Sequence, residues 1–325
     1  HNIHVTASIG VARYPADGST AEQLLRCADL AMHDAKKRGG NAVSLYAATM
    51  RQSAQQRALL EERLRRAIEE DQLLLHFQPQ FRFADGVLIG AEALVRWRDG
   101  DNLVSPADFI PLAEETGLIV PLGRWVIESA IAQLAAWMKD YDAGRSRPFR
   151  ISINLSPRQF QRSPVQHEVL QAIRRHAVPA DLIELEVTES VVLGPDGSVH
   201  SALDELRSAG CRIALDDFGT GYCSLSYLQQ LEIDTLKIDK SFVRHLAAIP
   251  GDDSRQSGAA IVSAMITLAQ RLNYEVVAEG VETDAQFAWL KDAGCGVCQG
   301  YYFSPPLPAE EFELRYWQGN AQSCH

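Results

Sequence analysis

The chain has 325 residues, of which 46% are hydrophobic and 22% are charged, a composition typical of a soluble globular protein. The formal net charge is −11, and residues 71–325 carry 34 acidic and 21 basic side chains, which argues against binding to a long nucleic acid. The longest apolar stretch, around residues 259–269, is shorter than the roughly 20 residues that cross a bilayer, so we expect no membrane span.

The cysteines favour a reducing compartment, and we therefore expect a cytoplasmic protein. Six are scattered along the chain, at Cys27, Cys211, Cys223, Cys295, Cys298 and Cys324. Cys295 and Cys298 form a single C-x-x-C without a second pair or histidines at zinc-binding spacing, which favours a structural role. The chain starts at His1 without a leader peptide, so we expect a piece of a longer protein whose upstream segments could include a membrane tether.

Residues 1–48 predict a small α+β fragment rather than a complete domain. Its elements are a strand over residues 3–11, a helix from Ser19 or Thr20 to about Lys37, a helix end at Gly39-Gly40 and a short strand over residues 43–46. One helix with two or three strands buries too small a core to fold alone.

Residues 49–70 predict a helical linker. Apolar side chains fall on one stripe of this helix, and oppositely charged side chains follow one another at a spacing of four residues: Leu60, Leu64, Ala67 and Ile68, and Glu61-Arg65 and Glu62-Arg66. A docking helix of the next domain fits the same pattern equally well.

From residue 71 to residue 325 short apolar strands alternate with helices. The pattern opens with an irregular hairpin, with strands over residues 73–78 and 87–97 and a turn at Asp85-Gly86. Further strands are expected over residues 149–155, 182–188, 211–216, 235–239, 275–278 and 296–299, with helices such as 106–115, capped by Ser105, and 259–272. This alternation favours an α/β fold, a TIM-like (β/α)8 barrel, and a doubly wound open sheet is the main alternative.

Polar side chains stand at the ends of the predicted strands, and one of them, Glu92, lies within the second strand. They are Glu92, Asn154, Glu186, Glu189, Asp216, Asp217, Lys237, Asp239, Glu279 and Gln299. Because the carboxyl ends of barrel strands meet on one face, we expect these side chains to share one pocket. Crowded carboxylates require a counter-ion, and oxygen ligands favour Mg²⁺ or Mn²⁺ over Zn²⁺. Two such ions would stabilise both oxygens of an in-line phosphoryl displacement.

Other residues near these strand ends fit the same chemistry. We interpret Lys237 as the group that holds or deprotonates the attacking water, with a charge-balancing ion pair as the alternative. Arg96 follows Glu92 by four residues on the same side of a strand, where it can clamp a phosphate. The glycine-containing loop at residues 219–221 predicts a lid over the substrate, although an ordinary turn fits equally well.

The segment Glu92-Ala93-Leu94-Val95-Arg96-Trp97 resembles the signature of EAL domains, and the resemblance extends from about Leu73 to Pro308. Further matching segments follow in order: Phe77-Gln78-Pro79, Asn154-Leu155-Ser156, Glu186-Val187-Thr188-Glu189, Asp216-Asp217-Phe218-Gly219, Lys237-Ile238-Asp239, Glu279-Gly280-Val281-Glu282 and Gln299-Gly300-Tyr301. A three-residue motif alone means little, but such an ordered series is specific.

The resemblance implies a dimeric barrel that hydrolyses the cyclic dinucleotide c-di-GMP to linear 5'-pGpG with two Mg²⁺ or Mn²⁺ ions and is inhibited by Ca²⁺. The implied metal ligands are Glu92, Asn154, Glu186, Asp216 and Asp217, with Asp239 or Glu279 near the second ion. The implied catalytic residues are Lys237, Glu279 and Glu189, the last of which steadies the loop after Asp217. Substrate contacts or metal support are implied for Gln78, Leu94, Arg96, Asp239 and Gln299.

Residues 1–48 resemble the last part of a GGDEF diguanylate cyclase domain, in segments 7–12 and 28–36. The signature loop of that domain is absent, so we expect no cyclase activity, and the partners would include upstream GGDEF and sensor regions. Cys223 and Gly296 depart from the EAL pattern at positions that affect loop dynamics or local support rather than chemistry.

Two other functions fit the residues. A catalytically silent c-di-GMP receptor would bind the dinucleotide and pass the signal to a partner. An enolase-like enzyme also places acidic ligands and a lysine base at barrel strand ends. The residues at the implied catalytic positions favour the phosphodiesterase.

Overall fold

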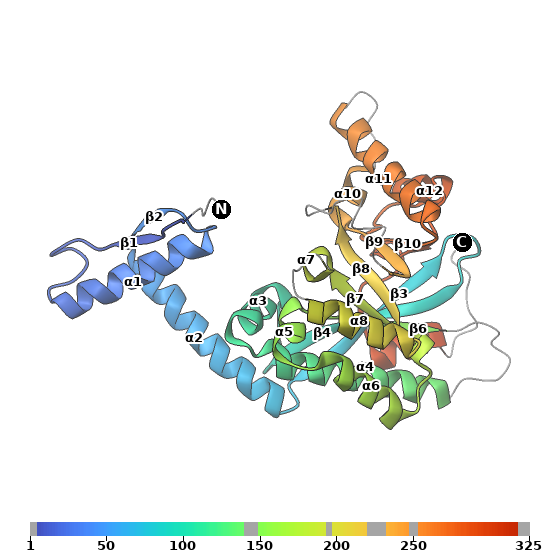
Figure 1. Cartoon of the computed structure of the whole chain (residues 1–325), viewed down its shortest axis with the longest axis horizontal. Helices are drawn as coiled ribbons and strands as arrows, with labels where there is room; N and C mark the ends of the chain where they lie inside the picture. The colour runs from blue at the N-terminus through green and yellow to red at the C-terminus, as the bar shows by residue number, and fades with distance from the viewer. Residues whose placement is uncertain (1–4, 140–148, 193–196, 220–231, 247–252, 318–325) are drawn as a thin grey trace. The chain divides into compact units, whose positions relative to one another are not determined.

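The computed structural model describes residues 5–139, 149–192, 197–219, 232–246 and 253–317 (Figure 1). Contacts divide the chain into two compact units, His1–Arg66 and Ala67–His325. None of the helices in the described ranges is long and apolar enough to cross a membrane.

The first unit is a small sheet covered by one helix. Strand β1 (Ile9–Val11) pairs in parallel with β2 (Val43–Leu45), and α1 (Ala21–Lys37) packs on this pair. A Cβ on Gly10 would lie 1.9 Å from Ala28 O, so β1 approaches α1 as closely as only glycine allows. The Thr20 side chain caps α1 by accepting a hydrogen bond from Gln23 N. Strand β1 is shorter than expected, and residues 1–4 lie outside the described ranges.

The expected linker helix is α2 (Ala48–Glu69). Leu64 and Ala67 are its fully buried apolar residues among those predicted for the stripe. The predicted ion pairs form at 3.3 Å between Arg65 and Glu61 and at 3.8 Å between Arg66 and Glu62, but they are exposed. Such pairs stabilise a helix little, so burial of the apolar stripe contributes more.

Within the described part of the second unit, eight strands close into a barrel, which confirms the TIM-like fold and excludes the open sheet. In chain order they are β3 (Leu73–Arg82), β4 (Leu88–Asp99), β6 (Arg150–Asn154), β7 (Ile183–Thr188), β8 (Arg212–Phe218), β9 (Thr235–Ile238), β10 (Glu275–Ala278) and β11 (Val297–Cys298). Each pairs in parallel with the next except β3, which runs antiparallel to both β4 and β11.

The irregular first hairpin is longer than predicted. Both β3 and β4 extend beyond the expected ranges, and their turn uses Gly86 at φ 65°. The sequence did not indicate β5 (Asn102–Val104), which pairs with β4, or β12 (Leu307–Pro308), which pairs with β3. The last barrel strand, β11, has two residues instead of the expected four.

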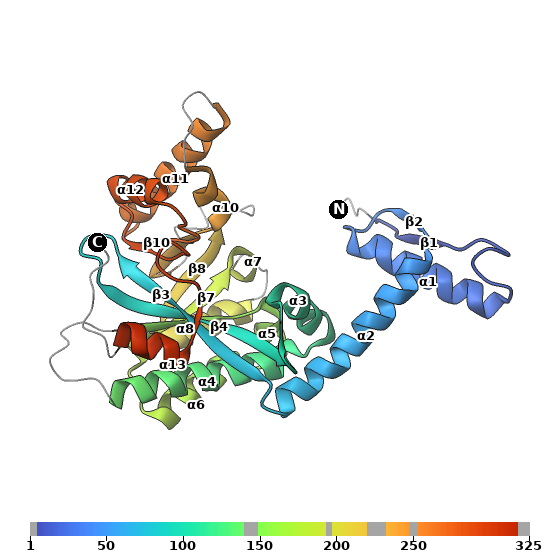
Figure 2. The ribbon, with the colours of Figure 1, turned by 180° about the vertical axis from the view of Figure 1, so that it is seen from behind.

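Helices cover the barrel wall (Figures 1 and 2). They are α3 (Pro106–Thr116), α4 (Ile119–Lys139), α5 (Pro157–Arg162), α6 (Val165–His176), α7 (Glu189–Val192), α8 (Gly197–Ser208), α10 (Lys240–Val243), α11 (Asp253–Arg271), α12 (Asp284–Asp292) and α13 (Ala309–Phe312). Helices α4, α6 and α8 lie side by side along one wall. Ser105 stands at the N-cap of α3 as expected, but its side chain makes no capping hydrogen bond.

Aromatic side chains pack where α4 and α13 meet β3. Trp137 lies edge-on to Phe77 at 4.8 Å between ring centroids and stacks on Phe312 at 5.1 Å. Its Nε1 donates to Glu313 Oε1 at 2.6 Å, so the polar edge of this buried ring is satisfied. This contact fixes the antiparallel strand that closes the barrel.

Burial of Leu134, which is 0% exposed on α4, predicts a measurable loss of stability on truncation. We expect Leu134→Ala to lower the free energy of unfolding by about 2–5 kcal/mol, through lost burial and the remaining cavity. Urea unfolding followed by tryptophan fluorescence measures this effect in the second unit, because every tryptophan lies at residue 97 or later.

Leu103→Ala is the matched control, because Leu103 is 55% exposed. Its effect should stay within about 0.5 kcal/mol. Equal losses in the two variants would contradict the placement of α4 on the barrel.

Candidate active site

Lys237 stands at the centre of a buried cluster of acidic side chains inside the barrel. Its Nζ lies 2.6 Å from Glu279 Oε1, 2.7 Å from Glu186 Oε2, 3.5 Å from Asp216 Oδ1 and 3.7 Å from Glu92 Oε2. The lysine is 1% exposed. Residues from β4, β7, β8 and β9 and from the end of β10 thus come together, as parallel strand ends in a barrel allow.

The cluster has more negative than positive charge, and its pKa values reflect this. Burial and repulsion from Glu92 raise the pKa of Glu186 well above its ordinary value. Burial raises the pKa of Glu279 to about 8, although Lys237 acts in the opposite direction. Burial would lower the pKa of Lys237, but the surrounding carboxylates outweigh it and raise that pKa well above its ordinary value. The lysine is therefore held in its charged form.

Hydrogen bonds fix the carboxylate of Glu92. Asn154 Nδ2 donates to Glu92 Oε1 at 2.7 Å, and Gln299 Nε2 donates to Glu92 Oε2 at 2.5 Å. Burial opposes ionisation of Glu92, but the charge of Lys237 and these two donors outweigh it and lower its pKa. Glu92 is therefore ionised, with each oxygen oriented by an amide.

Glu186 offers acceptor atoms that lack hydrogen bonds. Within the described residues, neither of its buried oxygens has a hydrogen-bond partner, and the short contact to Lys237 lacks hydrogen-bond geometry. Unsatisfied buried oxygens are costly, and they suit a hard cation such as Mg²⁺ or Mn²⁺. In the described ranges, however, no three acidic, His or Cys side chains are arranged to hold a metal as they stand, because the carboxylates turn toward Lys237.

The strand that carries Asp216 and Asp217 is irregular at this point. The register of β8 against β9 shifts between Leu215 and Phe218, and Asp217 has φ 54°. Asp217 N donates to Asp216 Oδ1 at 2.9 Å. Burial, then Asp216, then Asp239 raise the pKa of Asp217, so these carboxylates lie close enough to repel one another. A regular strand would point Asp216 and Asp217 to opposite faces.

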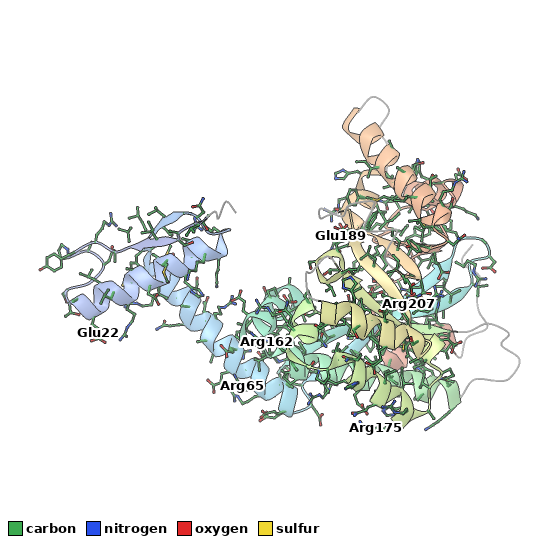
Figure 3. All side chains as sticks on the ribbon, in the orientation of Figure 1. Glu22, Arg65, Arg162, Arg175, Glu189 and Arg207 are labelled. Atoms are coloured by element: carbon green, nitrogen blue, oxygen red, sulfur yellow. The ribbon has the colours of Figure 1, made fainter. Side chains whose placement is uncertain are left out.

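Two further predicted residues hold backbone groups at strand ends. Glu189 begins α7 directly after β7, and its Oε1 accepts a hydrogen bond from Gly219 N at 2.8 Å (Figure 3). Asp239 caps α10 by accepting from Ser241 N at 2.9 Å. The rest of the predicted 219–221 loop, and Cys223, lie outside the described residues.

The hairpin supplies the remaining predicted residues. Gln78 pairs with Glu92 across the strands, accepts from Gln299 Nε2 at 2.9 Å and donates to Ser304 O. Leu94 and Arg96 share the strand face of Glu92, and Arg96 Nη1 donates to Val95 O at 2.9 Å. Four residues of strand separate Arg96 from Glu92 by about 13 Å, so Arg96 stands at the rim rather than in the cluster.

A second layer of polar residues below the cluster was missed in the sequence. It contains Gln80, Ser152, Glu184 and Thr235, all buried. Each of these residues is two positions away from a predicted site residue on the same strand. Both side chains therefore face the interior of the barrel. The period-two pattern of Gln78 with Gln80 and of Glu184 with Glu186 could have revealed this layer.

A cavity of about 450 Å³ lies at the opposite end of the barrel. It is lined by Arg82, Ile89, Arg150, Asp181, Arg207, Gly210, Cys211, Arg212 and Asp234. Its guanidinium groups are already paired with carboxylates, for example Arg82 with Asp85 and Arg150 with Glu275. Arg207, labelled in Figure 3, pairs with Glu232. The unsatisfied acidic cluster is therefore the stronger candidate for chemistry.

The C-x-x-C thiols are buried among backbone carbonyls. Cys295 Sγ lies 3.5 Å from Val297 O, and Cys298 Sγ lies 3.3 Å from Phe81 O. Burial raises the pKa of Cys295 to about 12, so this thiol stays protonated and unreactive at neutral pH.

Two protein families match successive parts of the chain. The EAL domain family matches residues 61–306, and the family described as diguanylate cyclase, GGDEF domain, matches residues 1–42. The bifunctional diguanylate cyclase/cyclic di-GMP phosphodiesterase MucR of Pseudomonas aeruginosa is 41% identical over 312 residues, covering 96% of this chain and 44% of MucR. The cyclic di-GMP phosphodiesterase PdeR of Escherichia coli is 38% identical over 318 residues, covering 97% of this chain and 46% of PdeR. The chain thus spans less than half the length of these curated relatives.

Solved structures of EAL proteins are also similar to this chain. The PaMucR phosphodiesterase in complex with c-di-GMP superposes with a TM-score of 0.72 at 41% identity, covering 78% of this chain and 99% of that one. The EAL enzyme Bd1971, in its form bound to cAMP and cyclic-di-GMP, has a TM-score of 0.75 at 31% identity, covering 91% of this chain and 76% of that one. The chain described here therefore belongs to the EAL domain family.

Proposed function

We propose that this protein hydrolyses c-di-GMP to linear 5'-pGpG by metal-assisted, in-line attack of water. The buried acidic cluster around Lys237 carries the proposal, because its excess negative charge requires more cations than the lysine supplies. The relatives named as cyclic di-GMP phosphodiesterases supply the substrate class.

The oxygen donors of the cluster have the chemistry that two hard divalent cations require, although the carboxylates turn toward Lys237 as they stand. Glu92, Asn154, Glu186 and Asp216 would hold one Mg²⁺ or Mn²⁺ ion, and Asp216, Asp217 and Asp239 or Glu279 would surround the other. When bound, the ions lower the pKa of water and neutralise charge that develops on the phosphate. Ca²⁺ is larger and coordinates with less strict geometry, so it should occupy the site and inhibit.

Lys237 is better suited to holding water than to accepting a proton. The surrounding carboxylates raise its pKa, and a charged ammonium is a donor without a free lone pair. From its central position it can donate to the attacking water and orient it toward phosphorus. It becomes a base only where other cations take over its contacts to Glu186 and Glu279.

The rim residues provide substrate contacts. Arg96 places a guanidinium on the same strand face as Glu92, where a phosphate of the dinucleotide can accept two hydrogen bonds. Leu94 lies between them and offers an apolar surface, and Gln78 supports Gln299 from the neighbouring strand. Glu189 steadies the chain after Asp217 through Gly219 N.

The organisation of the whole protein is part of the proposal. Residues 1–48 would be the remnant of a GGDEF domain, residues 49–70 a linker and residues 71–325 the phosphodiesterase. We further propose a cytoplasmic homodimer that associates through the barrel and is controlled by upstream GGDEF and sensor regions.

Incubation of the purified chain with c-di-GMP, followed by chromatography of the products, tests the function. We expect pGpG in Mg²⁺ or Mn²⁺, no product after chelation, and suppression by Ca²⁺. Tight binding of c-di-GMP without product in Mn²⁺ would instead identify a silent receptor. Turnover of carboxylate substrates but not cyclic dinucleotides would favour the enolase-like alternative.

Replacement of Lys237 tests its role in turnover. Lys237→Met keeps an unbranched side chain that is one atom shorter but removes the charge and donors, and we expect kcat to fall about 10²–10⁴-fold. Binding of c-di-GMP should change much less. Lys291→Met, at an exposed lysine on α12, is the matched control. A Lys237→Met enzyme with wild-type kcat would exclude both the base and the water-holding roles.

The raised pKa of Glu279 predicts how stability depends on pH in chelator-treated protein. Folded Glu279 keeps its proton up to about pH 8, whereas the unfolded side chain loses it near 4.5. The folded state binds more protons between these values, so the free energy of unfolding should fall as pH rises through this window. Glu186, whose pKa is also raised, acts in the same direction.

Urea midpoints at pH 5.5, 7 and 8.5 measure this dependence. In Glu279→Gln the decline should become shallower, because the titrating carboxyl group is gone. A wild-type midpoint that rises from pH 5.5 to 8.5, or an unchanged decline in the variant, would show that Glu279 does not bind the extra proton.

A further inference from the structure

We propose that Gln80 is a positioning residue for the metal ligand Glu92, on which it acts through the side chain of Gln299. The inference rests on the proposed function, because it assumes that Glu92 binds a cation. Gln80 lies on β3 inside the barrel, is 4% exposed, and follows Gln78 on the same face of the strand.

A chain of amide contacts joins Gln80 to the carboxylate. Gln80 Nε2 lies 3.0 Å from Gln299 Oε1, and Gln299 Nε2 lies 2.5 Å from Glu92 Oε2 and 2.9 Å from Gln78 Oε1. Gln299 therefore donates with its nitrogen to two acceptors and accepts with its oxygen from Gln80. Gln80 itself lies one layer below the acidic cluster.

The acceptor at the upper end sets the orientation of both amides. An ionised Glu92 only accepts hydrogen bonds, so Gln299 must turn its NH₂ group toward it. The oxygen of Gln299 then points away and needs a donor, which Gln80 supplies. A Gln299 amide turned the other way would place its oxygen against the Glu92 carboxylate.

The contacts at the lower end require the same orientation of Gln80. Ser152 Oγ donates to Glu184 Oε1 at 2.9 Å, so its oxygen is left to accept, and Gln80 Nε2 lies 3.5 Å from it. Glu184 is buried, and Thr235 Oγ1 donates to its other oxygen at 2.6 Å. Arg212 Nε lies 3.4 Å from Glu184 Oε2 and Arg150 Nη1 lies 3.8 Å from it, so this carboxylate is paired with two guanidinium groups. A second fixed anion thus stands below Gln80.

The neighbouring strand leaves room for this arrangement. A Cβ on Gly90 would lie 3.1 Å from Gln80 Oε1 and 2.8 Å from Arg150 O. Glycine at this position therefore lets β4 pass close to the Gln80 amide. With carboxylates at both ends and little free space beside it, Gln80 has one favourable orientation.

The expected effect is on metal affinity, because a ligand held in its binding geometry pays less entropy when the ion arrives. Loss of such a supporting hydrogen bond typically weakens metal binding by about 10–100-fold. In Gln80→Met the oxygen of Gln299 loses its donor, and we expect Mn²⁺ affinity to fall about 10-fold.

Gln80→Glu should be the more damaging change. A carboxylate at position 80 only accepts, so it draws the NH₂ group of Gln299 toward itself and turns the Gln299 oxygen toward Glu92. We expect the loss of Mn²⁺ affinity to approach 100-fold. A residue that only filled space would not produce this order, because Glu is closer to Gln in shape than Met is.

The test measures binding of Mn²⁺ to chelator-treated protein by electron paramagnetic resonance of the free ion, with no substrate present. Gln133→Met is the matched control, because Gln133 donates to Glu313 outside the barrel; its Mn²⁺ affinity should equal that of the wild type. Thermal unfolding shows that each variant is folded. Ser152→Ala provides a milder variant that keeps the contact between Gln80 and Gln299, and its loss should be smaller than that of Gln80→Met.

Wild-type Mn²⁺ affinity in Gln80→Met, or a smaller loss in Gln80→Glu than in Gln80→Met, would overturn the role of Gln80 and leave the proposed function intact. Failure of the wild-type protein to bind Mn²⁺ at all would overturn the proposed function together with the positioning role.

Discussion

The ion pairs of one buried ammonium group, that of Lys237, hold together the mouth of the barrel, which is the end that carries the acidic cluster. Lys237 brings side chains from several strands to within ion-pair distance, although burial of each charge is costly. The lysine compensates only part of the negative charge. The shifted pKa values of Glu186 and Glu279 reflect the remainder. A site with this imbalance is poised to accept cations, since they would replace protons on groups that burial keeps from ionising.

The two faces of each barrel strand have different tasks. Outward side chains such as Phe77, Ile153 and Leu185 form the apolar core with the helices. Inward side chains are largely polar, whereas the barrels of this class are commonly filled with branched apolar residues. Here amides, hydroxyls and ion pairs fill much of the interior, beside a small apolar cluster of Ile89, Val277 and Val297, so the packing below the acidic cluster is largely directional. The apolar outward faces of the strands therefore contribute most of the stability, and the polar inward faces hold the side chains of the acidic cluster in position.

The sequence predicted the barrel well because alternation of apolar strands and helices is a strong, repeated signal. It also named the residues that the structure brings around Lys237, because parallel strands end on one face. It missed the buried layer of Gln80, Ser152 and Glu184, because the only sign that these residues face inward is their spacing of two positions from predicted site residues. It could not predict the positive φ of Asp217, which depends on the register between β8 and β9. Lengths of short strands such as β11 were wrong because pairing partners, not propensity, set where they end.

The reversed direction of β3 decides where the polypeptide enters the barrel. Leu73, its first residue, pairs with Trp97 near the end of β4, on the side of the acidic mouth. A strand that ran parallel to its neighbours would begin at the far end, beside the arginine-lined cavity. The segment that precedes residue 71 is consequently joined to the barrel at the end that carries the acidic cluster, so a change in that segment acts first on the strand β3 that closes the barrel.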